Sequence, residues 1–162
     1  MDAGATLVQF VHVAGGAAWF GGSLFANAVL LPYVHRQPRE RQRELIRGVI
    51  LGPERWMIAA ALTAAVTGLV RGIVFGRIDG TDALATPYGL VWIASIAVAL
   101  TVFAIGGRIT SPAARRLRDD DGVWEGDSAA PAPLLARVCA GFRAELAGIT
   151  TILVLMTALA RL

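Results

Sequence analysis

Four long apolar runs, separated by short polar segments, dominate this chain. They lie at about residues 6–34, 56–75, 88–107 and 134–159. A helix that crosses the ~30 Å hydrocarbon core of a bilayer needs roughly 20 apolar residues, and each run is long enough. Lipid offers the backbone no hydrogen-bond partners, so these spans must be helical. The pattern predicts an all-α, multi-pass membrane protein in which a four-transmembrane-helix bundle forms a single domain over residues 1–162.

The composition leaves no room for a sizeable soluble domain. The chain has 162 residues, of which 56% are hydrophobic and 17% charged, whereas soluble domains carry about 25% charged residues. The single cysteine, Cys139, excludes an internal disulfide. The sequence contains no Gly-x-Ser-x-Gly motif, no phosphate-binding loop and no His–carboxylate pair at usable spacing, so nothing favours hydrolytic catalysis. Whether the protein is an enzyme stays open.

The basic residues, all arginines, are distributed unevenly between the two sides of the predicted bundle. Two of the segments between spans hold most of them: Arg36, Arg39, Arg41, Arg43, Arg47 and Arg55, then Arg108, Arg115, Arg116, Arg118 and Arg137. The opposite side has Arg71, Arg77 and Arg161. The positive-inside rule therefore predicts cytoplasmic Arg-rich segments and extracytoplasmic termini. Membrane orientation also explains the net charge of +3 better than nucleic-acid binding does.

The two Arg-rich segments differ in pattern. Residues 38–52 read as a short amphipathic helix on the cytoplasmic surface, and we expect its apolar positions to face lipid: Leu45, Ile46, Val49 and Ile50. The segment before the fourth span contains three aspartates at 119–121 and an Ala/Pro run at 129–133. We expect this segment to be a flexible linker.

The first span carries an unusual polar stripe. Steps of three or four residues from His12 lead to Trp19, Ser23 and Asn27, with glycines between them. Small residues let helices approach closely in a membrane, and a series with that spacing is present: Ala18, Gly22 and Ala26. We therefore expect Gly22 to face a neighbouring helix.

His12 is the candidate for chemistry. An ionisable side chain inside a membrane is rare and usually faces the bundle interior. Neutral imidazole is a common ligand for haem iron, copper and zinc, and Gly15 and Gly16 would leave room for a flat macrocycle. The alternative is a simple hydrogen bond to another helix, and the sequence leaves both open.

Four further residues share the expected depth of His12, near the outer ends of the other spans: Arg71, Tyr88, Trp92 and Met156. Met156 is a credible second axial haem ligand or copper(I) ligand, and Arg71 could pair with a haem propionate. The candidate cofactor site thus combines these four residues with His12 and Trp19, and the candidate metal ligands are His12 and Met156. The same residues also have explanations that need no cofactor. Met156 would pack against its neighbours, Arg71 would extend to the membrane interface, and Tyr88 and Trp92 would belong to an aromatic belt.

Two other polar groups accompany the spans. Arg143 and Glu145 are two residues apart in the fourth span, so they point to different faces and do not pair with each other. We expect Glu145 to meet another helix, a backbone donor or water. His35, beside Arg36, is expected to be exposed at the cytoplasmic rim.

The first helix, with His12, residues 19–22 (Trp-Phe-Gly-Gly) and Leu31-Pro32, resembles that of the copper-resistance CopD domain and of HemJ-like membrane proteins linked to protoporphyrinogen oxidation. Shorter similarities follow at residues 67–69, 88–90 and 143–146. The resemblance implies a four-helix bundle in a bacterial plasma membrane with the first-helix His facing inward. It associates that His with haem b in HemJ-like proteins and with copper movement in CopD-like proteins.

Three functions follow as hypotheses. The first is a protein that binds haem b or copper near the outer face through His12, in electron transfer or in metal or haem handling. The second is a cofactor-free structural subunit that packs within a larger membrane complex or a homo-oligomer. The third is an oxidoreductase acting on a porphyrin or a quinone.

Overall fold

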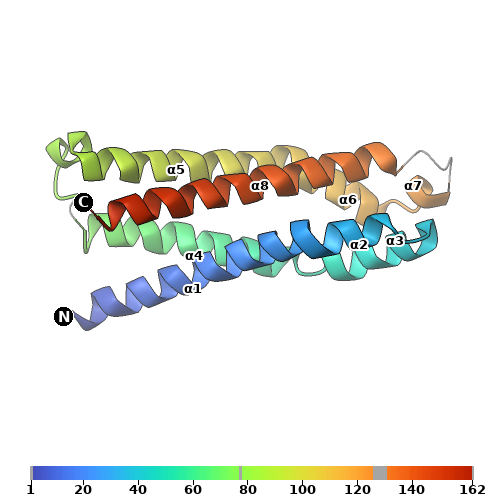
Figure 1. The fold of residues 1–162 in the computed structure, drawn as a ribbon, viewed down its shortest axis with the longest axis horizontal. Coiled ribbons are helices and arrows are strands. Elements are labelled where there is room, and N and C mark those ends of the chain that lie inside the picture. Colours follow the sequence, from blue (N-terminus) through green and yellow to red (C-terminus); the bar gives the residue numbers. More distant parts are fainter. Residues whose placement is uncertain (1, 77, 126–130, 162) are drawn as a thin grey trace.

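The chain folds into four long helical rods that run side by side (Figure 1). The computed structural model describes residues 2–76, 78–125 and 131–161. Among these residues, four helical segments are long and apolar enough to cross a membrane: Ala3–His35, Arg39–Ile73, Pro87–Asp119 and Ala132–Leu159. The predicted all-α four-helix membrane bundle is therefore confirmed.

Three of the four rods are composite helices. The first consists of α1 (Ala3–Phe25), the π-helical turn η1 (Ala26–Leu30) and α2 (Leu31–His35). The second consists of α3 (Arg39–Leu45), the π-helical turn η2 (Ile46–Ile50) and α4 (Glu54–Ile73). The third consists of α5 (Pro87–Ile105), the π-helical turn η4 (Gly106–Thr110) and α6 (Ser111–Asp119). The fourth is α8 (Ala132–Leu159), and two short helices, η3 (Asp82–Ala85) and α7 (Gly122–Glu125), lie between rods.

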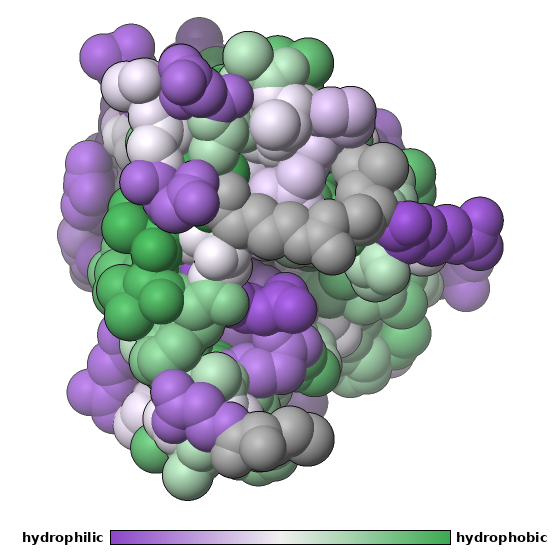
Figure 2. Space-filling view, turned by 90° about the vertical axis from the view of Figure 1, so that its left-hand side faces the viewer, coloured by the Kyte–Doolittle hydropathy of each residue, from purple (hydrophilic) through white to green (hydrophobic). Residues whose placement is uncertain are grey.

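The two ends of the bundle differ. Both chain ends lie at one end, called here the terminal end, while α3, α6 and α7 form the opposite, Arg-rich end (Figure 1). Figure 2 faces the terminal end and shows hydrophilic groups at several points on it, with apolar groups between them. This arrangement is the one expected for a bundle whose middle is in lipid and whose two ends meet water.

The bundle is built from two helix pairs. Most contacts between rods join α1 to α4 and α5 to α8, whereas α1–α8 and α4–α5 contacts are fewer. Figure 1 shows α1 and α4 on one side and α5 and α8 on the other. The seam between the pairs is where the bundle has space for a site.

The segment at 38–52 is helical, as expected, but its apolar face does not point to lipid. Ile46 and Ile50 are buried, although Val49 is exposed. They pack in an apolar cluster with residues of the neighbouring rods, among them Leu117 and Trp124. The expectation of a lipid-facing surface helix is wrong at these two positions because α2 and α6 extend beside the segment and offer it an apolar partner surface.

The expectation of a flexible linker is wrong for the aspartates at 119–121. Asp121 accepts hydrogen bonds from Arg47, at 2.7 Å, and from Arg43. These bonds lower the pKa of the Asp121 carboxyl, with the Arg47 bond making the largest contribution. Arg118 bridges Asp119 and Glu54, at 2.9 and 3.1 Å. These ion pairs hold the segment to the rods. Residues 129 and 130 of the Ala/Pro run, like Arg77, lie outside the described residues.

The π-helical turns explain how the first and third rods accommodate a proline, and why the third rod runs past its predicted end at 107. Pro32 and Pro112 lie two residues after η1 and η4. A proline ring clashes with the carbonyl four residues earlier, and that carbonyl lies inside the π-helical turn in each case. The wider turn moves it away: the Leu31 and Ser111 N–H groups donate instead to carbonyls five residues back. The first rod therefore continues through Pro32 to His35, one residue beyond its predicted end, and the third continues through Pro112 to Asp119.

Candidate functional site

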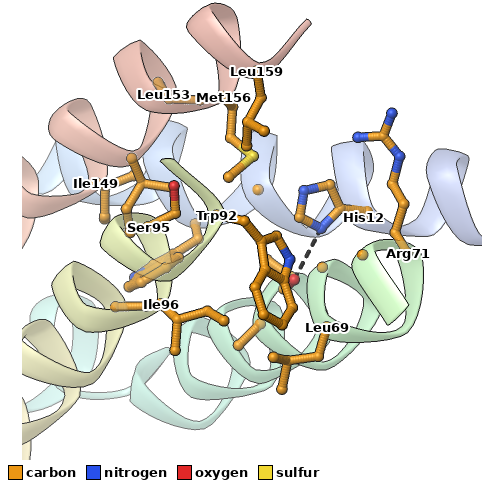
Figure 3. Close-up of a pocket in the computed structure, with 18 of the residues that line it drawn as sticks. His12, Leu69, Arg71, Trp92, Ser95, Ile96, Ile149, Leu153, Met156 and Leu159 are labelled. Atoms are coloured by element: carbon orange, nitrogen blue, oxygen red, sulfur yellow. Dashed lines mark hydrogen bonds between the residues drawn. The ribbon is translucent and has the colours of Figure 1, made fainter. Parts of the chain in front are cut away.

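The structure brings all six candidate residues to one cavity at the terminal end, between the two helix pairs. This outer cavity has a volume of about 230 Å³ and mostly apolar walls from α1, α4, α5 and α8. The six are His12, Trp19, Arg71, Tyr88, Trp92 and Met156. Figure 3 shows His12 on α1 facing across the cavity toward Trp92 and Met156.

The His12 ring is fixed by the neighbouring helix. Its Nδ1 lies 2.9 Å from the Ala64 carbonyl oxygen, shown as a dashed line in Figure 3. A carbonyl only accepts, so Nδ1 carries the hydrogen and donates it. In the neutral ring the lone pair is then on Nε2. Metal-ligating histidines have this arrangement, because a bond to the second nitrogen fixes the tautomer and the orientation of the ring.

Glycine on α4 makes this orientation possible. A Cβ atom at Gly68 would lie 3.0 Å from Cε1 of His12 and 3.4 Å from Nδ1. The imidazole therefore lies close to the α4 backbone, half-buried in a place that a side chain would take. The sequence analysis did not identify Gly68 as a site residue. Its signal is the run of small residues at intervals of four, Ala64, Gly68 and Gly72.

The other walls of the cavity are aromatic and apolar. The Trp92 indole occupies the space beside Gly72, where a Cβ atom would meet it. Tyr88 lies one turn earlier on α5, and Met156 extends from α8 (Figure 3). Arg71 is exposed at the rim, and among the described residues it has neither an ion pair nor a hydrogen bond. An unpaired guanidinium at the mouth of an apolar cavity suits an amphipathic anion with an apolar body.

Trp19 forms the floor of the outer cavity. It is only 5% exposed. Its Nε1 donates to the Glu145 carboxylate at 2.7 Å, and its ring stacks on Phe103 at a centroid distance of 5.8 Å. Glu145 thus meets another helix, as expected. Arg143 is exposed and does not pair with it.

Of the small residues on α1 that were expected to allow close helix packing, only some face a neighbouring helix. Gly22 does face a neighbour, since a Cβ atom there would lie 2.5 Å from Sδ of Met57. Ala18 is exposed, so it takes no part in the closest approach. That approach occurs at Gly15, where a Cβ atom would lie 3.1 Å from the Ala64 nitrogen.

His35 is exposed, as expected, and donates from Nδ1 to the Leu31 carbonyl at 2.8 Å.

The donor set indicates which metals the cavity suits. Within the described part of the chain, no group of three or more His, Cys, Asp or Glu side chains is placed to hold a metal ion. The outer cavity offers one imidazole nitrogen and one thioether sulfur. It therefore fits a metal that brings most of its ligands with it, as haem iron does, better than an ion that needs a cage of side chains.

The volume of the cavity limits how a large ligand would lie. Small-molecule pockets usually measure about 300–1,000 Å³, and the outer cavity is smaller. Three of its lining leucines, Leu69, Leu100 and Leu153, are 39%, 63% and 40% exposed on the flanks of the bundle. A macrocycle bound at His12 would either displace the Trp92 indole or keep one apolar edge in lipid.

Searches against protein-family models, curated proteins and solved structures found no match to this chain, so the geometry of the site carries the functional argument.

Proposed function

We propose that this protein binds haem b in the membrane, with His12 as the side chain that would hold the iron, and serves electron transfer or haem handling. The observation that carries the proposal is the His12 ring, whose Nδ1–H is held by the Ala64 carbonyl. Such a ring presents Nε2 to the outer cavity in the form that binds iron. The resemblance of the first helix to HemJ-like proteins points to the same ligand.

Each residue of the cavity has a task in this proposal. His12 holds the iron, and Gly68 gives the imidazole its place against α4. Arg71 pairs with a propionate at the rim. Trp92, Met156 and the leucines exclude water from the ring faces, which tunes the reduction potential. A bound haem supplies one-electron chemistry; the protein supplies the ligand, the orientation and the apolar surroundings.

Copper is the second candidate, and Met156 is the observation that favours it. A thioether and an imidazole are both good ligands for copper(I), and both residues line the same small cavity. A bare ion would also fit the volume without displacing Trp92. In this case the protein would handle copper near its terminal end.

The visible absorption spectrum of detergent-purified protein, with metal analysis of the same sample, separates the candidates. A Soret band with stoichiometric iron supports haem b, and copper without a Soret band supports the second candidate. A colourless, metal-free protein that takes up neither added haem nor copper(I) contradicts both. It would favour the cofactor-free structural subunit.

The matched variants are His12→Ala and His35→Ala, because these are the only two histidines of the chain. We expect His12→Ala to lose the cofactor and His35→Ala, at the exposed Arg-rich end, to keep it. Full occupancy in His12→Ala would remove His12 from the site. Equal loss in both variants would indicate a general folding defect, which thermal unfolding of the two proteins would reveal.

A further inference from the structure

A second cavity lies on the other side of Trp19. This inner cavity measures about 520 Å³ and is lined from the Trp19–Phe103 stack toward the Arg-rich end. Trp19 and Phe103 line both cavities, so the stacked pair is the wall between them. Most of the inner lining is apolar. Its charged members are two carboxyl groups, Glu145 beside the wall and Glu54 at the beginning of α4.

The surroundings of Glu145 provide no counter-charge. Glu145 lies near the middle of α8 and is partly buried. Its hydrogen bond within the described residues is the one from Trp19, and no Arg or His in that part of the chain forms an ion pair with it. Glu54, the other charged residue of the cavity, is engaged by Arg118 at 3.1 Å. The cavity residues from α1 and α5 carry no charge.

A carboxylate in such a place needs a cation. The effective cost of moving an ion into an apolar interior is several kcal/mol, and one hydrogen bond from an indole offsets only part of it. A metal ion would require further ligands, and the described residues contain no group of three that could supply them. A proton needs no ligand cage, so it is the cation that this cavity suits.

We propose that Glu145 is a proton-binding site inside the membrane and that it exchanges its proton with the aqueous phase at the Arg-rich end, through the inner cavity. The hydroxyl groups of Ser23, Thr110 and Ser111 line the route. The volume has room for several waters, each taking about 30 Å³. The positive-inside rule assigns this end to the cytoplasm.

The wall at Trp19 limits where the proton goes. An indole N–H donates and has no lone pair to accept a proton, so Trp19 cannot pass a proton from Glu145 to the outer cavity. The proton leaves by the route along which it entered, unless the Trp19 ring leaves both Glu145 and Phe103. Glu145 therefore takes up and releases its proton on one side only, the Arg-rich side, and this site is separate from the one at His12.

Infrared difference spectroscopy of the full-length protein in proteoliposomes tests the protonation step. We expect a protonated-carboxyl C=O band that decreases as the pH is raised. Glu145→Gln keeps an acceptor for Trp19 and should lose the band, whereas Glu54→Gln should keep it. A spectrum without such a band in the unsubstituted protein, or a band that persists in Glu145→Gln, would overturn the assignment.

Cysteine accessibility tests the route. In a Cys139→Ser background, Ser23→Cys reports on the inner cavity and Ser95→Cys on the outer one, and both serines are buried. A membrane-impermeant thiol reagent should modify Ser23→Cys only from the Arg-rich side. Modification only from the terminal side, or no modification from either side, would show that the inner cavity does not connect Glu145 to the Arg-rich end. The Ser95→Cys protein shows whether reagent access differs between the two cavities.

Discussion

At the scale of single residues, His12 and Glu145 lie within the bundle on opposite sides of one tryptophan. His12 is held by a backbone carbonyl of α4 and faces the outer cavity. Glu145 is held by Trp19 and faces the inner cavity. The same indole that forms the floor of the first site therefore anchors the second, so Trp19 belongs to both sites.

Arg71 offers a test of the rim of the outer cavity. We expect Arg71→Gln to weaken haem binding by at most about five-fold, because an exposed ion pair is worth about 0.2–1 kcal/mol. Titration of the purified apoprotein with haemin measures the change, and Arg108→Gln at the other end is the control. Equal affinities of the Arg71→Gln and Arg108→Gln proteins would mean that Arg71 does not touch the propionates.

The residues that line the site could be predicted from the sequence, but the hydrogen bonds between them could not. Depth alone places His12, Arg71 and Met156 in one layer, because each residue of a helix rises ~1.5 Å. The nearer partner of His12 Nδ1 is the backbone carbonyl of Ala64, at 2.9 Å, and a backbone carbonyl leaves no trace in residue type; the Thr67 hydroxyl is a second partner at 3.3 Å. Glu145 and Trp19 are 126 positions apart, and nothing local in the sequence pairs them.

At the scale of elements, small residues decide how closely α1 approaches α4. A side chain at Gly15 would meet the backbone of α4, with Ala64 N at 3.1 Å and Ala60 O at 3.2 Å. A side chain at Gly22 would meet only the flexible end of Met57. Backbone cannot move aside as a methionine can, so Gly15 is the stricter requirement.

This difference predicts a graded loss of stability. We expect Gly15→Leu to lower the melting temperature in detergent strongly, since overpacking typically costs about 1–3 kcal/mol, and Gly22→Leu to lower it less. Gly21→Leu is the control, because a Cβ atom at Gly21 meets nothing within 4 Å. A Gly15→Leu protein as stable as Gly21→Leu would show that the α1–α4 approach has been misjudged.

The Arg-rich end shows why element boundaries are hard to predict. Apolar Ile46 and Ile50 fit lipid and a protein cluster equally well in sequence, and only the neighbouring α6 decides between them. Asp121 looks like part of a solvated loop because its partners, Arg43 and Arg47, are more than 70 positions away. Pro112 lies beyond the predicted end of the third span at 107, because the sequence does not reveal the wider turn that lets the helix continue through this proline.

The ion pairs of Asp121 predict a response to acid. Hydrogen bonds from Arg47 and Arg43 make the pKa of Asp121 lower in the folded protein than in the unfolded chain. Their stabilising effect is therefore present above the unfolded pKa, about 3.9, and is lost as pH falls through the folded value. We expect the α7 amides to be less protected at low pH, relative to their intrinsic exchange rate at the same pH, and the same loss of protection at neutral pH in Asp121→Asn. Unchanged neutral-pH exchange in that variant would mean that the ion pairs do not hold α7.

At the scale of the whole molecule, two helix pairs meet along a seam that contains both cavities. The terminal end carries the His12 site, and the Arg-rich end leads to Glu145. The number of helices and their antiparallel order follow from hydrophobic runs and short connections, which is why the sequence predicts them well. The pairing of α1 with α4 and of α5 with α8 depends on side-chain fit and could not be read from the runs.

The orientation of the bundle is a prediction from the arginines. In a Cys139→Ser background, we expect an impermeant thiol reagent added outside intact cells to label Asp82→Cys, at the terminal end, but not Arg116→Cys, at the Arg-rich end. Both positions are exposed, so access to water does not differ. Labelling of Arg116→Cys alone would reverse the orientation and with it the side from which each cavity is reached.

The most direct test of the central claim, that Nε2 of His12 holds a haem iron, is chemical rescue. We expect His12→Gly to be purified without a Soret band and to regain haem when haemin and free imidazole are added together, because imidazole can take the vacated place beside Gly68. Haemin alone should not restore the band, and His35→Gly should need no imidazole. A His12→Gly protein that binds haem fully without imidazole would contradict the account.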